Sequence, residues 1–106
     1  MILYGLKNCD TCRKAVKALA AKYDVHLWDV RADGPPDFAR FYAAFGDKIL
    51  NTRSTTWRGL TEDERARPMM ELLAEHPALM KRPVIVVGDH MTLGWDKAAQ
   101  AEWLGN

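Results

Sequence analysis

The chain opens with Ile2-Leu3-Tyr4-Gly5-Leu6-Lys7-Asn8-Cys9-Asp10-Thr11-Cys12, a short apolar run followed by two cysteines three positions apart. The apolar run predicts a strand, and the cysteines stand where a helical pattern begins. A helix starting at such a turn directs unpaired backbone N–H groups and the positive end of its dipole toward the turn. A thiolate gains most from that place, so the pair indicates redox chemistry rather than a structural cross-link.

Composition predicts one small domain with a single core, because 106 residues with 48% hydrophobic and 27% charged content fall within the usual size of a domain. With 15 Lys and Arg against 14 Asp and Glu, the net charge of +1 argues against general binding to nucleic acid or to membranes. The sequence shows no apolar stretch of roughly 20 residues and no charged leader before a long apolar run. We therefore expect a reducing, cytoplasmic setting, in which the chain's only two cysteines are catalytic, redox-sensing or metal-binding.

Helices and strands are predicted to alternate along the chain. The first helix is expected over about residues 10–22, on the helical spacing of Cys12, Ala15, Val16, Leu19 and Tyr23. A strand is predicted from Val25 to Val30, before the Gly and Pro residues of 32–36. A second helix follows, with an apolar stripe of Phe38, Phe41, Tyr42 and Phe45.

Residues 47–82 are predicted to be mostly helical but irregular. Their clearest signal is the spacing of Thr61 and Glu64, which indicates a capping box. Pro68 is expected to start another helix at its first turn, and this helix carries inward Met69, Leu72 and Leu73.

The period of the pattern changes after residue 82. The continuous apolar run Val84–Val87 is typical of a strand that is buried on both faces. Gly88-Asp89 predicts a two-residue turn into a strand over His90–Leu93. Asp96 is expected to cap a final helix that ends at about Leu104.

This order predicts an α/β arrangement, a short sheet surrounded by helices. With a C-x-x-C motif after the first strand, it resembles the thioredoxin fold. Three longer segments make the resemblance more specific, namely YGLKNCDTCRKA at 4–15, LNTRSTTWR at 50–58 and HPALMKRP at 76–83. In this order they resemble the arsenate reductase (ArsC)/Spx family, most closely its YffB-like branch, over nearly the whole chain. The resemblance implies one thioredoxin-like (glutaredoxin-like) domain over 1–106, with a four-stranded mixed sheet, flanking helices and a helical insertion at about 47–82 between strands two and three.

Cys9 carries the clearest chemistry. Its place at a helix start and the nearby cations Lys7, Arg13 and Lys14 favour a thiolate, which Asp10 opposes. A buried, inert cysteine is the plainer alternative, but such cysteines seldom lie at a turn beside three cations. Zinc is the other alternative, although one C-x-x-C with scattered histidines supplies no second paired half-site. We therefore predict Cys9 as a nucleophile with a lowered pKa, and no metal site.

Two roles stay open for Cys12. It lies one helical turn beyond Cys9 on the same side, within reach to resolve a mixed disulfide. The same position also belongs to the apolar stripe of the first helix, so Cys12 fits equally well as a core residue.

Arg53 and Arg82 are the candidate anion-binding residues, because guanidinium groups hold oxyanions and carboxylates with paired, planar donors. Without further information, each arginine would be predicted to be an ordinary solvated surface charge. The resemblance implies more, since arginines beside the catalytic cysteine bind the oxyanion in arsenate reductases of this family, and these two match two such positions. The third position falls at or beside Trp95, which puts arsenate reduction in doubt unless Arg58 or another cation substitutes. Trp95 fits equally with packing of the final helix on the sheet.

Pro83 stands at the start of a strand, where proline is tolerated. In thioredoxin-like folds a cis proline here lies beside the active cysteine and presents backbone to a thiol partner, and the resemblance implies this for Pro83. The residues expected to contact substrate are therefore Lys7, Asn8, Arg13, Arg58, Pro83 and Trp95.

The favoured function is that of an enzyme in which the Cys9 thiolate attacks an oxidised sulfur or an oxyanion, while Arg53 and Arg82 hold the anionic part. Cys12 or external glutathione then resolves the covalent intermediate. The expected thiol donor is glutathione or a glutaredoxin- or thioredoxin-type protein, with no tightly bound cofactor. The alternatives are arsenate reductase proper, a Spx-like redox-switched regulator that binds RNA polymerase, and an inactive binding module, which the paired cysteines argue against. We expect a monomer that contacts neither nucleic acid nor membrane.

Overall fold

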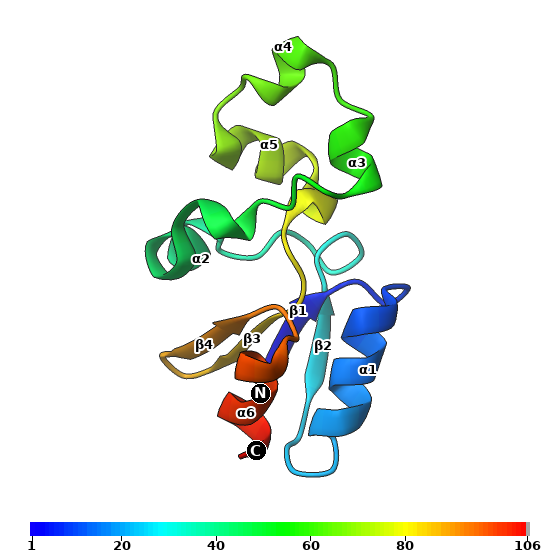
Figure 1. Cartoon of the computed structure of the whole chain (residues 1–106), viewed down its shortest axis with the longest axis vertical. Helices are drawn as coiled ribbons and strands as arrows, with labels where there is room; N and C mark the ends of the chain where they lie inside the picture. Colours follow the sequence, from blue (N-terminus) through cyan, green and yellow to red (C-terminus); the bar gives the residue numbers. More distant parts are fainter. Residues whose placement is uncertain (106) are drawn as a thin grey trace.

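A single sheet of four strands organises the computed structural model, which describes residues 1–105 (Figure 1). The strands lie in the order β2-β1-β3-β4, with the bounds β1 Ile2–Gly5, β2 His26–Asp29, β3 Val84–Val87 and β4 His90–Leu93. β1 is parallel to β2 and antiparallel to β3, and β4 is antiparallel to β3. The predicted four-stranded mixed sheet of thioredoxin-like type is confirmed.

The first helix, α1, is shorter than the predicted range of 10–22 and covers Asp10–Leu19. Its 10 residues span about 15 Å, close to the roughly 13 Å of the four-residue strand beside it, so the chain has returned to the start of the sheet by Leu19. A turn follows, in which the N–H groups of Lys22 and Tyr23 donate to the Leu19 carbonyl. The second strand is likewise shorter than 25–30.

The sheet separates two hydrophobic clusters, because side chains alternate between its faces. Leu3 and Ile85 are partners across β1 and β3, and on their face α1 and α6 (Lys97–Leu104) contribute Cys12, Ala15, Leu19 and Trp103. Tyr4 and Val84 are the next pair, and they belong to the other cluster, together with Phe41. The helices between β2 and β3 supply most of this second cluster.

Helices between β2 and β3 gather beyond the end of the sheet at which β1 finishes (Figure 1). They comprise α2 Phe38–Phe45, α3 Thr55–Arg58, α4 Glu62–Arg65, α5 Met69–Glu75 and the 3₁₀ turns η1 Gly46–Ile49 and η2 Pro77–Leu79. The two ends of this segment are tied together, because the Asn51 N–H donates to the Leu79 carbonyl at 2.8 Å and the Lys81 N–H to the Ile49 carbonyl at 2.7 Å. Residues 51–56 are thereby held beside the residues that enter β3.

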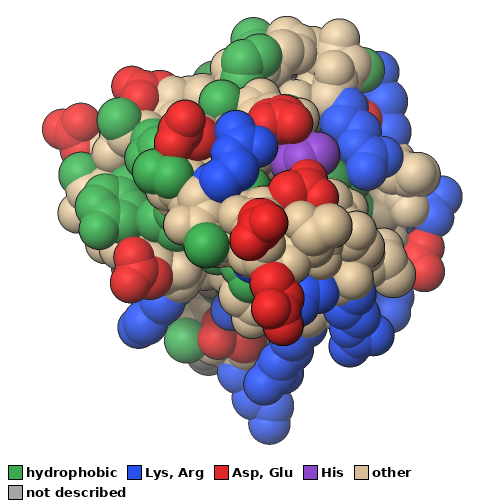
Figure 2. Space-filling view, turned by 90° about the horizontal axis from the view of Figure 1, so that it is seen from above, with side chains coloured by type: hydrophobic (Ala, Val, Ile, Leu, Met, Phe, Trp, Pro, Cys, Tyr) green, Lys and Arg blue, Asp and Glu red, His purple; other side chains and the backbone are tan. Residues whose placement is uncertain are grey.

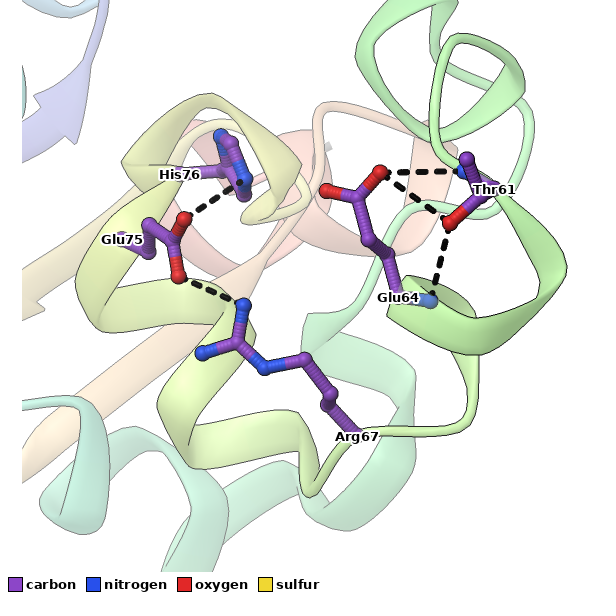
Figure 3. A network of polar contacts seen from close by, with 5 residues as sticks. All are labelled: Thr61, Glu64, Arg67, Glu75 and His76. Atoms are coloured by element: carbon purple, nitrogen blue, oxygen red, sulfur yellow. Dashed lines mark hydrogen bonds and ion pairs between the residues drawn. The ribbon is translucent and has the colours of Figure 1, made fainter.

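Polar contacts fix the outer helices (Figure 3). The predicted capping box of α4 is confirmed, since the Glu64 N–H donates to Thr61 Oγ1 and the Thr61 N–H donates to Glu64 Oε1, each at 3.2 Å. Arg67 contacts Glu75 at 2.6 Å across α5, and His76 Nε2 lies 3.7 Å from the same carboxylate. Acidic and basic side chains both crowd this face, seen from above in Figure 2.

Three details of the sequence prediction were wrong. Tyr42 is 44% exposed, because it lies beside rather than on the stripe formed by Phe38, Phe41 and Phe45. Val87 is 43% exposed, since it borders the Gly88-Asp89 turn, where the strand leaves the core. Pro68 precedes α5 as its N-cap rather than occupying its first turn.

The end of the chain follows the prediction. Asp96 caps α6 by accepting a hydrogen bond from the Ala99 N–H at 2.9 Å, and the helix ends at Leu104. Among the described residues, no helix combines the length and the hydrophobicity needed to cross a membrane.

Candidate active site

The strand order brings three segments to one edge of the sheet. Because β1 and β2 are parallel, the loops that follow them leave from the same edge. β3 is antiparallel to β1, so Arg82 and Pro83, which precede β3, lie at that edge as well. β1 is the middle strand of these three, so Cys9, in the loop after β1, is flanked by the loop after β2 and by Arg82.

A pocket of about 320 Å³ lies at this edge. The segments around the sheet contribute Leu6, Asn8, Cys9, Arg31 and Arg82. The helical segment between β2 and β3 contributes Asn51, Ser54, Thr55, Thr56 and Ala78. A larger hollow of about 660 Å³ lies beside β4 and α6, but neither cysteine and no arginine lines it. The smaller pocket is therefore the candidate active site.

Cys9 is the N-cap residue of α1 and lies partly exposed in the pocket. Burial raises the pKa of the Cys9 thiol, but the backbone N–H and thiol of Cys12 and the guanidinium of Arg82 outweigh that effect and hold this pKa below its ordinary value. The arrangement therefore favours a thiolate at the position where a helix start stabilises negative charge.

Cys12 is completely buried among the residues that α1 packs against the sheet. Burial and the neighbouring Cys9 raise the pKa of the Cys12 thiol to about 12. At neutral pH, Cys12 is therefore a protonated hydrogen-bond donor to Cys9, and only a minute fraction of it is a thiolate that could attack a disulfide. Of the two roles predicted for Cys12, core packing and attack on a mixed disulfide, the structure favours packing, together with a hydrogen bond to Cys9.

Gly5 makes room for the Cys12 sulfur. A Cβ atom at Gly5 would lie 2.4 Å from Cys12 Sγ, far inside any normal contact. We expect Gly5→Ala to destabilise the fold by about 1–3 kcal/mol, as overpacking of a close-packed core usually does. Because the clash involves one sulfur, the double variant Gly5→Ala with Cys12→Ala should lose less stability than the sum of the two single changes. Urea denaturation of all four proteins measures this, and strictly additive losses would contradict the predicted clash.

Arg82 reaches Cys9 from the segment before β3. Its Nη1 donates to the Ala78 carbonyl at 2.5 Å and points to the Met80 carbonyl at 3.4 Å, which fixes the guanidinium. Its Nε is buried and has no hydrogen-bond partner among the described residues. Since a buried unpaired donor is costly, a thiolate at Cys9 offers Arg82 the acceptor that it lacks.

Asp29, at the end of β2, ties the two loops of the pocket together. This buried carboxylate accepts backbone hydrogen bonds from Lys7 at 3.0 Å, Arg31 at 2.8 Å and Ala32 at 2.9 Å. The hydrogen bond from the Lys7 backbone contributes most to holding the pKa of Asp29 below its ordinary value, and those from Ala32 and Arg31 add to it. One side chain thus joins the loop that leads to Cys9 to the loop that carries Arg31.

Removal of Asp29 should weaken the fold in a pH-dependent way. Asp29→Ala leaves three backbone donors without their acceptor, and we expect a loss of about 2–3 kcal/mol at pH 7. Because the folded pKa is depressed, this stabilisation is complete above the unfolded value near 4 and is lost as the pH falls below it. The difference in unfolding free energy between wild type and variant should therefore shrink as the pH falls below about 4. The matched control is Asp24→Ala, because Asp24 is exposed and its carboxylate has no hydrogen bond among the described residues. A pH-independent difference in unfolding free energy for Asp29→Ala would contradict the account.

The structure brings together only part of the predicted site. Asn8, Cys9 and Arg82 line the pocket, with Cys12 directly behind Cys9. The peptide bond between Arg82 and Pro83 is cis, which confirms the isomer that the resemblance implied. The Pro83 side chain is fully buried, and its carbonyl accepts a hydrogen bond from the Gly94 N–H at 2.8 Å.

The other predicted residues do not line the pocket. Arg53 and Arg58 are exposed, and Arg53 lies in the loop that supplies Asn51 and Ser54. The exposed Arg13 contacts Asp10 at 2.6 Å. The Lys7 side chain is exposed as well, and only its backbone is engaged, through Asp29. Trp95 lies at the same edge of the sheet, but it is partly buried and packs against the cluster of Leu3, Cys12, Ile85 and Trp103.

Sequence reasoning missed Arg31 and the polar residues of 51–56 as parts of the pocket. A signal for Arg31 existed, because it follows the second of two parallel strands whose ends meet at one edge. The segment 50–58 was predicted to contribute its arginines to the site. It contributes small polar residues instead, namely Asn51, Ser54, Thr55 and Thr56. Within residues 1–105, no group of three His, Cys, Asp or Glu side chains is placed to hold a metal ion.

Comparison of the chain with known proteins points to one family. The family model described as "ArsC family" matches residues 4–103. The chain belongs to the ArsC family. A solved structure of a YffB protein is 33% identical, with a TM-score of 0.85 and coverage of 97% of both chains.

Two curated relatives extend the comparison. An uncharacterized protein of Haemophilus influenzae is 39% identical over 103 residues, covering 90% of this ArsC-family chain and 90% of the relative. The global transcriptional regulator Spx of Listeria innocua is 27% identical over 105 residues, covering 90% of this chain and 79% of the relative. Membership in this family, together with the activated Cys9, supports thiol-dependent redox chemistry.

Proposed function

We propose that this ArsC-family protein is a cytoplasmic thiol–disulfide oxidoreductase that uses Cys9 as its nucleophile and glutathione, or a glutaredoxin- or thioredoxin-type protein, as its thiol donor. The observation that carries the proposal is the partly exposed Cys9 at the start of α1, with a lowered pKa and Arg82 beside it. A pocket of about 320 Å³ is at the low end for small-molecule sites, which suits a small thiol.

The reaction follows from the chemistry of the two cysteines. The Cys9 thiolate attacks one sulfur of a disulfide, the substrate S–S bond breaks, and a mixed disulfide with Cys9 forms. The departing half leaves as a thiolate and takes a proton from solvent. A thiol of the donor then attacks the mixed disulfide, which returns Cys9 to its thiolate form and leaves the donor oxidised.

External thiol, rather than Cys12, is the better resolving group. Cys12 has a pKa of about 12 and is fully buried, so its thiolate is scarce at neutral pH and an incoming disulfide cannot reach it. In the proposed cycle, Cys12 instead donates a hydrogen bond to Cys9 and lowers its pKa. Arg82, which the Ala78 carbonyl holds in place, stabilises the negative charge of the Cys9 thiolate.

A coupled assay tests the proposed function. The protein is mixed with hydroxyethyl disulfide or with a glutathionylated peptide, and NADPH oxidation is followed with glutathione and glutathione reductase present. We expect turnover that depends on the protein and on glutathione. Absence of turnover with every disulfide, in a protein shown to be folded, would overturn the proposal.

Assays on the same purified protein distinguish the proposed function from two others, arsenate reduction and redox-switched regulation. Arsenate is the weaker substrate, because Arg53 does not line the pocket and the partly buried Trp95 packs against the core. Arsenate turnover that exceeds disulfide turnover would reverse this order. The Spx relative makes a redox-switched regulator the second candidate. Tight binding to RNA polymerase together with no disulfide turnover would favour it.

A further inference from the structure

Arg31 is a second guanidinium in the pocket, and nothing in the reaction above uses it. It follows β2 and lines the pocket together with Cys9 and Arg82. Its side chain is exposed, and its guanidinium forms no hydrogen bond or ion pair within residues 1–105. Arg31 is therefore available to an anionic ligand.

The backbone at Arg31 is fixed although its side chain is not engaged. Its N–H donates to Asp29 Oδ1 at 2.8 Å, and the other oxygen of Asp29 accepts from Lys7 at 3.0 Å. The same carboxylate therefore sets the position of Arg31 relative to the loop that ends at Cys9. A binding group held this way needs little ordering of its backbone when a ligand arrives.

Arg31 and Arg82 differ in what they have left to offer. Arg82 already donates Nη1 to the Ala78 carbonyl, and its guanidinium acts on Cys9, whose pKa it lowers. Arg31 approaches from the opposite side of β1 and keeps all its side-chain donors, a planar set that matches a carboxylate. The Cys9 sulfur therefore has Arg82 as its guanidinium partner, and Arg31 is left for a carboxylate of the substrate.

We infer that Arg31 is a specificity-determining residue that binds a carboxylate of the disulfide substrate, so that the protein prefers carboxylate-bearing disulfides such as oxidised glutathione to uncharged ones. The inference rests on the proposed function, because it concerns the first step of that reaction. In that step Cys9 forms a mixed disulfide with one glutathione, and the other glutathione leaves as a thiolate that solvent protonates. Arg31 takes no part in bond making and acts only through binding.

The test compares two disulfides on the same protein. Second-order rate constants for the reaction of reduced protein are measured with oxidised glutathione and with uncharged hydroxyethyl disulfide, for wild type, Arg31→Ala and Arg31→Lys. We expect Arg31→Ala to slow the reaction with oxidised glutathione about threefold to tenfold, as suits an ion pair at an open site, and to leave hydroxyethyl disulfide within about twofold. Arg31→Lys should restore part of the preference, because it keeps the charge but loses the paired donors.

Two controls remove the simpler explanations. Lys17→Ala deletes one positive charge from the exposed face of α1, and it should leave the ratio of the two rate constants unchanged. Raising the ionic strength to about 1 M, where the screening length is about 3 Å, should reduce the wild-type preference toward that of Arg31→Ala.

The outcomes separate this inference from the proposed function. If wild type reacts with hydroxyethyl disulfide but Arg31→Ala leaves the ratio unchanged, the inference is wrong and the proposed function stands. Equal slowing of both disulfides by Arg31→Ala would also contradict it, since that result indicates a structural effect. If wild type reacts with neither disulfide, the proposed function fails and the inference fails with it.

Discussion

Cys9→Ser is expected to abolish thiol–disulfide exchange, with a fall in rate of at least about 10³-fold. Only a thiolate attacks a disulfide readily, and a serine hydroxyl at this position is neither ionised at neutral pH nor a comparable nucleophile. The helix start and Arg82 cannot compensate, since both act by stabilising a negative sulfur that is no longer present. The measurement is the single-turnover rate with hydroxyethyl disulfide.

The matched control for this change is Cys12→Ser, the same substitution one helical turn further on. It keeps a hydrogen-bond donor next to Cys9, so the exchange rate should stay within about tenfold of wild type. Because Cys12 is fully buried, a hydroxyl there should cost about 1–2 kcal/mol of stability, and the melting curve should be recorded for both variants. A fall in this rate with Cys12→Ser as large as with Cys9→Ser would contradict the assignment of Cys9 alone as the attacking nucleophile.

Arg82→Gln should produce the second largest effect. Loss of the guanidinium removes a charge and a hydrogen bond that lower the pKa of Cys9, so this pKa should rise toward its ordinary value. A higher pKa leaves less Cys9 thiolate at pH 7, and the exchange rate should fall with it, by roughly tenfold for each unit of the rise. The defect should shrink as the pH rises above the ordinary thiol pKa of about 8.5, where both proteins are ionised.

The pH–rate profile distinguishes this role from a structural one. Lys14→Gln removes a positive charge from the exposed face of α1 and contacts none of the pocket, so its profile should match that of wild type. A fall in rate for Arg82→Gln that is the same at every pH would mean that Arg82 only holds the fold. Arg53→Gln measured beside it tests the sequence-based prediction for Arg53 separately.

The sequence allowed the sheet, the place of Cys9 at a helix start and the place of Arg82 beside it to be predicted, because each depends on local patterns or on a family resemblance. The apolar runs fix β1 and β3, and the N-cap position of Cys9 follows from the start of a helical pattern. Element ends were less predictable. α1 stops at Leu19 because the length of the neighbouring strand sets how far the helix runs, and neighbouring strands are not visible in the helix's own residues.

Charges near Cys9 in sequence proved to be poor guides to charges near it in space. Arg13 was expected to favour the thiolate, but it pairs with Asp10 on the exposed side of α1. Arg82 lowers the pKa of Cys9 from 73 positions away in the sequence. Arg31 was missed because its place depends on the parallel pairing of β1 and β2 and on the buried carboxylate of Asp29.

The most direct test of the account is the pH dependence of alkylation at each cysteine. The reduced wild-type protein is treated briefly with iodoacetamide across a pH series, and mass spectrometry of the digested protein locates the adducts. We predict that Cys9 reacts with a midpoint below about 8.5, the value of a free cysteine, and that Cys12 stays unmodified in the folded protein. A Cys9 midpoint at or above that value, or modification of Cys12 before Cys9, would contradict the claim that this site is built around a Cys9 thiolate.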